Sequence, residues 1–167
     1  MTGRGRIVVV GVGNSWRGDD GAGPAVAAAL RGRLGPGVPG APVAVVDLDG
    51  EAARLVDAWD GADLAVVVDA VRTGAPPGTL HRLDAGDVHA TATASSHALG
   101  VQHAVALARA LGRLPRRLVL VGVEGADFGH GTHLSDPVAA AVEPASRLVA
   151  EVVAEAAATA IDGPAPP

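Results

Sequence analysis

Two adjacent aspartates, Asp19 and Asp20, lie in a glycine-rich stretch, GVGNSWRGDDGAGP, at residues 11–24. The stretch follows an apolar run and precedes an alanine-rich one, which predicts a turn between a strand and a helix. Such turns often hold a phosphate on the helix N-terminus. Where a P-loop has Gly-Lys-Ser/Thr, however, this chain has Gly18-Asp19-Asp20, and Trp16 replaces the third glycine of a dinucleotide fingerprint. Two carboxylates repel a phosphate, so the turn favours a cation.

Two further polar residues fall at positions where they could join such a site. Asp69 ends the apolar run LAVVV, where a carboxylate is costly unless it is paired, for example with Arg72, or coordinates a cation. His97 lies near the start of a predicted helix, where its ordinary role is a hydrogen bond to the backbone. We expect Asp19 to cap the first helix and Asp20 to point away from it. If the fold brings Asp20, Asp69 and His97 together, they form a facial metal site with open positions.

Other hydrolytic chemistries find less support in the sequence. The chain has no cysteine, and its serines show no recognisable Ser-His-Asp order. The stretch GNSWRG misses the G-x-S-x-G elbow by one residue. His130 and His133, in HGTH, are a possible second metal pair, although the glycine-rich context predicts exposure to solvent. Two routes stay open: a metal-polarised carbonyl or metal-bound water, or Asp20 or Asp69 as a general base on water.

Hydrophobic periodicity predicts the elements that must position these residues. Predicted buried strands lie at residues 7–12, 43–48, 64–69 and 117–123, and a possible edge strand lies at 79–83. Predicted helices lie at residues 24–34 and 51–59, from 95 or 96 to 111, and from 136 to about 158. Pro144 is expected to kink or split the last helix. The alternation predicts one α/β domain over residues 1–161, with three layers and a mostly parallel sheet, and a loose tail at 162–167. Ligands bind such sheets beyond the carboxyl ends of the strands, which is where Asp20 and Asp69 are expected.

Composition restricts the function further. Among the 167 residues, aromatic side chains make up only 2%, so the predicted core consists of valine, leucine, alanine and isoleucine. The formal net charge of −5 gives no sign of a nucleic-acid surface. No apolar segment approaches the roughly 20 residues that a membrane span needs, and the N-terminus has no signal-peptide pattern. We therefore expect a soluble cytoplasmic protein.

Four segments, in this order, resemble the hydrogenase maturation proteases. They are the stretch at residues 11–24, VVVDAV at 66–71, SSHALGV at 95–101, and LVLVGVEG with LSDPVAAAVEPA within 118–145. Proteases of this family remove the C-terminal extension from the large subunit of nickel–iron (NiFe) hydrogenases after nickel has been inserted. After the second predicted strand, the chain has DLDGEA at 47–52 where the family usually has a DGGT type of motif, and this segment is linked to substrate recognition.

The resemblance implies a phosphorylase/hydrolase-like fold and a specific role for each candidate residue. Asp20, Asp69 and His97 would bind the metal, and Asp20 and Asp69 would be catalytic. The metal would be nickel supplied by the NiFe hydrogenase large-subunit precursor, although other divalent metals could occupy the site. The protease is expected to act as a monomer, without nucleic acid or membrane. Two rival functions are a chaperone that binds the nickel-loaded precursor without cutting it and a metal-dependent amidohydrolase for a small molecule.

Overall fold

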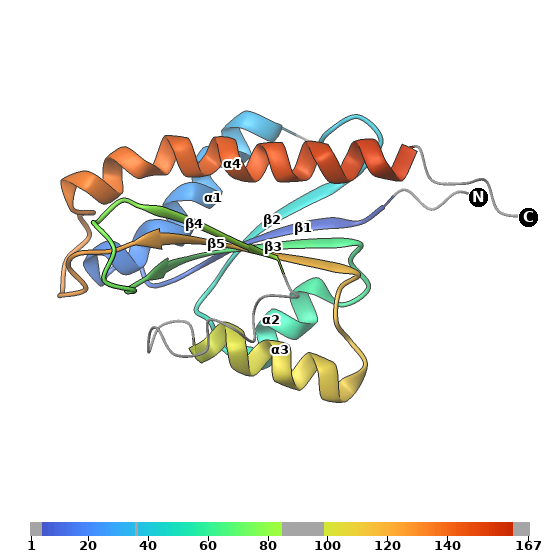
Figure 1. Cartoon of the computed structure of the whole chain (residues 1–167), viewed down its shortest axis with the longest axis horizontal. Helices are drawn as coiled ribbons and strands as arrows, with labels where there is room; N and C mark the ends of the chain where they lie inside the picture. Colours follow the sequence, from blue (N-terminus) through green and yellow to red (C-terminus); the bar gives the residue numbers. More distant parts are fainter. Residues whose placement is uncertain (1–4, 36, 85–98, 162–167) are drawn as a thin grey trace, which may run out of the picture.

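The computed structural model describes residues 5–35, 37–84 and 99–161 of the chain (Figure 1). Within these ranges, strands and helices alternate as the sequence predicts. The strands are β1 (Ile7–Val12), β2 (Val43–Leu48), β3 (Leu64–Val71), β4 (Leu80–Asp84) and β5 (Arg117–Glu124). The helices are a short 3₁₀ turn η1 (Gly18–Gly21), α1 (Ala22–Leu34), α2 (Ala52–Trp59), α3 (Leu99–Leu111) and α4 (Asp136–Ile161).

The strands form one sheet in the order β2-β1-β3-β5-β4. β1 is parallel to both β2 and β3, β3 is parallel to β5, and only β4 runs antiparallel, on the edge beside β5. A parallel sheet is covered on both faces, and nearly every residue of β1 and β3 is accordingly buried. The prediction of a mostly parallel α/β sheet is confirmed, including the edge position of β4.

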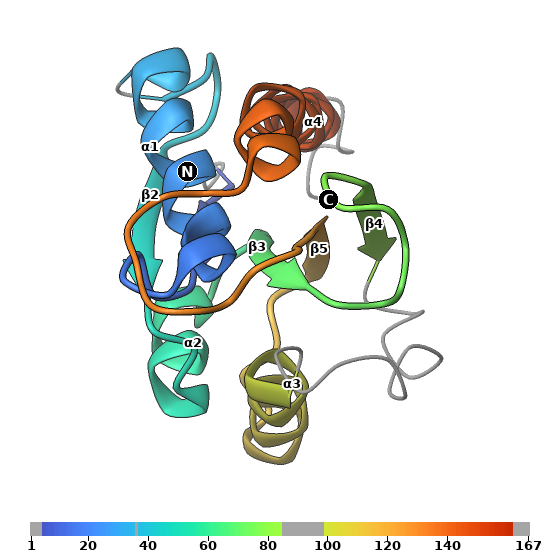
Figure 2. The ribbon, with the colours of Figure 1, turned by 90° about the vertical axis from the view of Figure 1, so that its left-hand side faces the viewer.

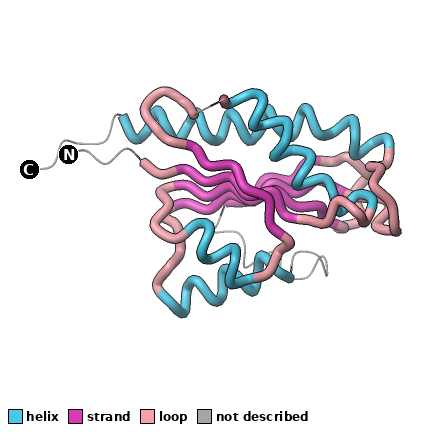
Figure 3. The backbone as a smooth tube through the Cα atoms, turned by 180° about the vertical axis from the view of Figure 1, so that it is seen from behind, coloured by secondary structure: helices cyan, strands magenta, loops and turns pink. Residues whose placement is uncertain are grey.

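Helices cover both faces of the sheet, so the molecule has three layers (Figures 2 and 3). One core lies between the sheet and the helices α1 and α4, and includes Val66 and Val68. The other lies between the sheet and the helices α2 and α3, and includes Ala65 and Val67. Because side chains alternate along a strand, Asp69 projects to the same face as Val67, toward α2 and α3.

The last helix is continuous through Pro144, so of the two expected outcomes, a kink or a split, the split is wrong. α4 runs from Asp136 to Ile161 as one helix with Pro144 inside it, so the proline does not split it. The buried positions Val138, Ala141, Ala145 and Val149 keep a helical spacing on both sides of the proline. Packing of this continuous apolar face on the sheet outweighs the hydrogen bond that the proline cannot donate. None of the described helices is long and apolar enough to cross a membrane.

A glycine contact seats α1 directly on the sheet. A Cβ atom added to Gly23 would lie 2.2 Å from the carbonyl oxygen of Val12 and 2.6 Å from that of Val68. Backbone oxygens in two core strands cannot move aside cheaply, so we expect Gly23→Ala to lower the free energy of unfolding by about 3 kcal/mol. Gly32, in the same helix, has no atom within 4 Å of such a Cβ, and Gly32→Ala should stabilise the helix by about 0.5–1 kcal/mol. Urea unfolding of both variants checks the prediction, and equal effects would contradict it.

Candidate active site

A pocket of about 310 Å³ lies where β1 and β3 end. Residues from four segments line it: the end of β1 with the loop and η1 that follow it, the segment just after β2, the end of β3, and the first turn of α3. The lining residues are Val12, Gly13, Asn14, Arg17, Asp20, Asp49, Gly50, Asp69, Gly100 and Val101. The pocket thus contains both Asp20 and Asp69, at the edge of the sheet where they were expected.

Asp20 is held by a tightly folded loop. Its Oδ2 atom accepts a hydrogen bond from the Asn14 backbone N–H at 2.9 Å, and its own N–H donates to the Arg17 carbonyl at 3.2 Å. At Gly13, where φ is +148°, an added Cβ would lie only 1.9 Å from the Asp20 carbonyl oxygen. Only glycine fits this close approach, which explains why the GVGN segment precedes the carboxylate in the chain.

Asp69 is a buried acid that forms no ion pair with an arginine among the described residues. Its residue exposure is 7%, and it ends the run of apolar residues in β3. Burial raises the pKa of Asp69 well above its ordinary value, and the nearby Asp20 carboxylate raises it further, while the Ala70 N–H lowers it in part. Arg72 is not among the groups that shift the pKa of Asp69; its guanidinium carbon lies 4.6 Å from the centre of the Phe128 ring. Such a pair of carboxylates is suited to hold a proton or to bind a cation.

Asp19 has a different role from the helix cap that the sequence predicted. Its carboxylate is fully buried and accepts four hydrogen bonds from the loop between β5 and α4. The donors are the N–H groups of Ala126 (2.8 Å), Asp127 (2.9 Å) and Ser135 (2.7 Å), and the Ser135 hydroxyl (2.8 Å). Burial alone would raise the pKa of Asp19, but these donors together hold it below its ordinary value. Adjacent aspartates therefore diverge, Asp20 toward the pocket and Asp19 toward the β5–α4 loop.

Comparisons with known proteins identify the family. The family profile described as hydrogenase maturation protease matches residues 25–152. The chain belongs to the hydrogenase maturation protease family. The matched segment includes Asp69 and begins just after Asp20.

Relatives of this protease support the assignment over more of the chain. The hydrogenase expression/formation protein HupD of Thiocapsa roseopersicina is 33% identical over 153 residues, which are 89% of this chain and 68% of HupD. HoxM of Azotobacter vinelandii is 35% identical over 155 residues, 89% of this chain and 72% of HoxM. The solved structure of the hydrogenase maturating endopeptidase HybD from E. coli has a TM-score of 0.76 and 30% identity, and the match covers 90% of this chain and 93% of HybD. The protein is therefore an endopeptidase of the hydrogenase maturation type.

The histidine expected in the protease site lies outside the described residues. His97 falls in the undescribed segment 85–98, so its place beside Asp20 and Asp69 stays a prediction. His130 and His133, the possible second pair, are exposed in the β5–α4 loop. Within residues 5–35, 37–84 and 99–161, no three histidine, aspartate or glutamate side chains form a group that could hold a metal ion.

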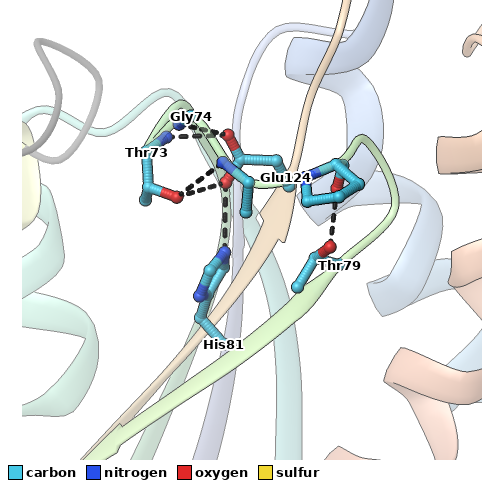
Figure 4. Close-up of polar contacts among 7 residues, drawn as sticks. Thr73, Gly74, Thr79, His81 and Glu124 are labelled. Carbon is cyan, nitrogen blue, oxygen red and sulfur yellow. Dashed lines mark hydrogen bonds and ion pairs between the residues drawn. The ribbon is translucent and has the colours of Figure 1, made fainter.

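Glu124 is a buried acid of the maturation protease that the sequence analysis did not single out. Figure 4 shows its carboxylate at the end of β5, facing the turn that follows β3. Its oxygens accept hydrogen bonds from the N–H groups of Thr73 (2.7 Å) and Gly74 (3.1 Å) and from the Thr73 hydroxyl (2.8 Å). The His81 Nε2 atom lies 3.0 Å from the carboxylate. Glu124 thus ties β5 to the segment that begins four residues after Asp69.

This arrangement predicts a pH-dependent contribution to stability. Burial raises the pKa of Glu124, but hydrogen bonds from Thr73, His81 and Gly74 hold it below the ordinary value of 4.5. Because the pKa of Glu124 is lower in the folded than in the unfolded protein, its carboxylate stabilises the fold when the pH is above the pKa of the unfolded state. This contribution disappears as the pH falls through the pKa of the folded state. We expect Glu124→Gln to cost about 2 kcal/mol at neutral pH and progressively less in acid.

Urea unfolding of both proteins from about pH 7 to about pH 3 checks this expectation. Glu151→Gln, on an exposed position of α4, is the control and should follow the wild type throughout. A constant difference between Glu124→Gln and the wild type at every pH would contradict the prediction.

Proposed function

We propose that this protease removes the C-terminal extension of a NiFe hydrogenase large-subunit precursor after nickel insertion, and that the pocket recognises the precursor's nickel. The observation that carries the proposal is the pairing of Asp20 and Asp69 in one pocket, with the pKa of buried Asp69 raised by its environment. The names of the relatives, which refer to hydrogenase formation and maturation, support the choice of substrate.

The residues fit a metal that arrives with the substrate. Asp20 and Asp69 offer carboxylate oxygens, and His97 would add a nitrogen, a donor set that suits a divalent first-row metal. The chain has no cysteine, so it has no thiolate to compete with the precursor for nickel. Ligands of this kind can contact the nickel of a filled precursor and still release the product. Nickel bound there would polarise the neighbouring peptide carbonyl.

Hydrolysis also requires groups that move protons. A water oxygen adds to the carbonyl carbon of the scissile peptide, the C–N bond breaks, and the amine takes up a proton. A carboxylate whose pKa lies nearer to neutrality than usual can accept the proton from water and return it to the leaving amine. Burial and the nearby Asp20 carboxylate both raise the pKa of Asp69, which makes Asp69 the candidate for this proton transfer.

The deciding experiment incubates the purified protein with nickel-loaded and nickel-free precursor and measures intact masses. Loss of a C-terminal peptide from the nickel-loaded precursor alone is the expected result. A stable complex without loss of mass would indicate the chaperone instead. Neither cleavage nor binding would leave the amidohydrolase as the better explanation. Equal cleavage of both precursors would keep the protease and contradict nickel recognition.

A further inference from the structure

An exposed tryptophan lies in the loop that lines the pocket. Trp16 is 73% exposed and lies in the β1–α1 loop between two residues near it in the chain, Asn14 and Arg17, that line the pocket. The other exposed large apolar side chains among the described residues are Leu107, Leu111 and Leu114, in and after the second half of α3. A tryptophan exposed in the loop that lines the pocket offers a large apolar surface with a polar N–H, and this residue type is enriched at protein interfaces.

The backbone that presents Trp16 is fixed on both sides. The Trp16 N–H donates to the Asn14 side-chain oxygen at 2.9 Å, and the Trp16 carbonyl accepts from the Gly131 N–H at 3.0 Å. The Gly18 N–H in turn donates to the Gly131 carbonyl at 2.9 Å, which completes a parallel bridge between Arg17 and Gly131. A loop that is already ordered loses little conformational entropy when it binds, so little of the free energy of contacts to Trp16 is spent on ordering the loop.

Arg17 adds a positive charge to an acidic pocket. The pocket is lined by three carboxylates, those of Asp20, Asp49 and Asp69, and Arg17 is the one cation among its described lining residues. Within the described parts of the chain, no carboxylate forms an ion pair with the Arg17 guanidinium, which is exposed. Its five N–H donors are suited to the carbonyl oxygens of a polypeptide.

We propose that Trp16 and Arg17 form a binding rim for the precursor's polypeptide next to the scissile bond. This inference rests on the proposed function and names the surface that holds its substrate. A pocket of about 310 Å³ is the size of a small-ligand site, so a protein substrate must extend across its edge. Trp16 contacts the apolar part of that segment, and Arg17 donates hydrogen bonds to its carbonyl oxygens.

The rim contacts parts of the substrate other than the reacting bond itself, so its contacts are the same in the ground state and in the transition state. Loss of such contacts raises KM and leaves kcat nearly unchanged. Tryptophan and arginine are the residue types most often found as interface hot spots. We expect KM to rise about 30-fold for Trp16→Ala and about tenfold for Arg17→Gln.

The test measures kcat and KM for nickel-loaded precursor, together with binding of fluorescently labelled precursor before turnover begins. Leu111→Ala and Arg109→Gln are the controls, because both residues are exposed at the end of α3 remote from the pocket. Trp16→Leu should recover part of the affinity, and urea unfolding should match the wild type for every variant. A fall in kcat at constant KM, or no difference from the controls, would overturn the inference. If wild-type protein binds but does not cleave, the proposed function fails, and the binding of the variants still decides whether the rim exists.

Discussion

Asp20→Ala is expected to slow cleavage of nickel-loaded precursor by more than about a hundredfold. Mutation of a residue that only supports a metal ligand already lowers metal affinity or activity by about ten- to a hundredfold, and Asp20 would be a ligand itself. The Asp20 carboxylate lines the pocket and lies near Asp69, where it would contact the incoming metal. Its removal also takes away one of the two influences that raise the pKa of Asp69, so the remaining acid becomes a weaker base.

Stability distinguishes this effect from a damaged fold. Asp20 is only half-buried and packs no apolar core, so the free energy of unfolding should change by less than about 1 kcal/mol. Asp57→Ala removes an exposed carboxylate from α2 and serves as the control, with wild-type cleavage expected. Precursor processing, read by intact mass with and without nickel, is the measurement. Full activity of Asp20→Ala would rule out the proposed metal site.

Asp19→Ala is expected to lower the free energy of unfolding by about 4 kcal/mol, because it leaves several buried donors without an acceptor. The affected donors are backbone N–H groups of the β5–α4 loop and the Ser135 hydroxyl. The sequence alone predicts a loss of about 1 kcal/mol, the usual value of a helix cap. The larger figure follows from the full burial of the carboxylate.

Asp127→Ala provides the matched comparison in the same loop. Asp127 is exposed, and its side chain accepts one hydrogen bond, from the Gly129 N–H at 2.8 Å. Its loss should therefore cost no more than about 1 kcal/mol. Urea unfolding at neutral pH measures both variants. If Asp19→Ala and Asp127→Ala have the same free energy of unfolding, the four hydrogen bonds to the buried Asp19 carboxylate add no stability beyond that of an exposed hydrogen bond.

Local patterns could predict most of the fold and two members of the candidate site. The valine-rich runs of β1 and β3 are buried on both faces, and only central strands of a parallel sheet require such runs. Asp69 stands out because it ends one of these runs, and Asp20 because a second carboxylate at a helix entrance is unnecessary for capping.

The remaining contacts join residues that are far apart in the sequence, and a local sequence pattern does not predict such contacts. Asp19 accepts hydrogen bonds from residues 107 to 116 positions away in the sequence. The tendency of aspartate to cap a nearby helix therefore predicted the wrong partner. Glu124 and His81 are likewise 43 positions apart. At Pro144, intrinsic propensity predicted a kink or a split, and packing of the apolar face of α4 kept the helix from splitting.

The strand order explains why a hollow exists at this place. From β1 the chain continues to β2 on one side of the sheet, whereas after β3 it continues to β4 and then to β5 on the other side. The connections that leave β1 and β3 therefore separate, and a crevice opens between them at the topological switch point of the sheet. The order of the strands thus fixes the position of the pocket, and Asp20 and Asp69 make this crevice acidic.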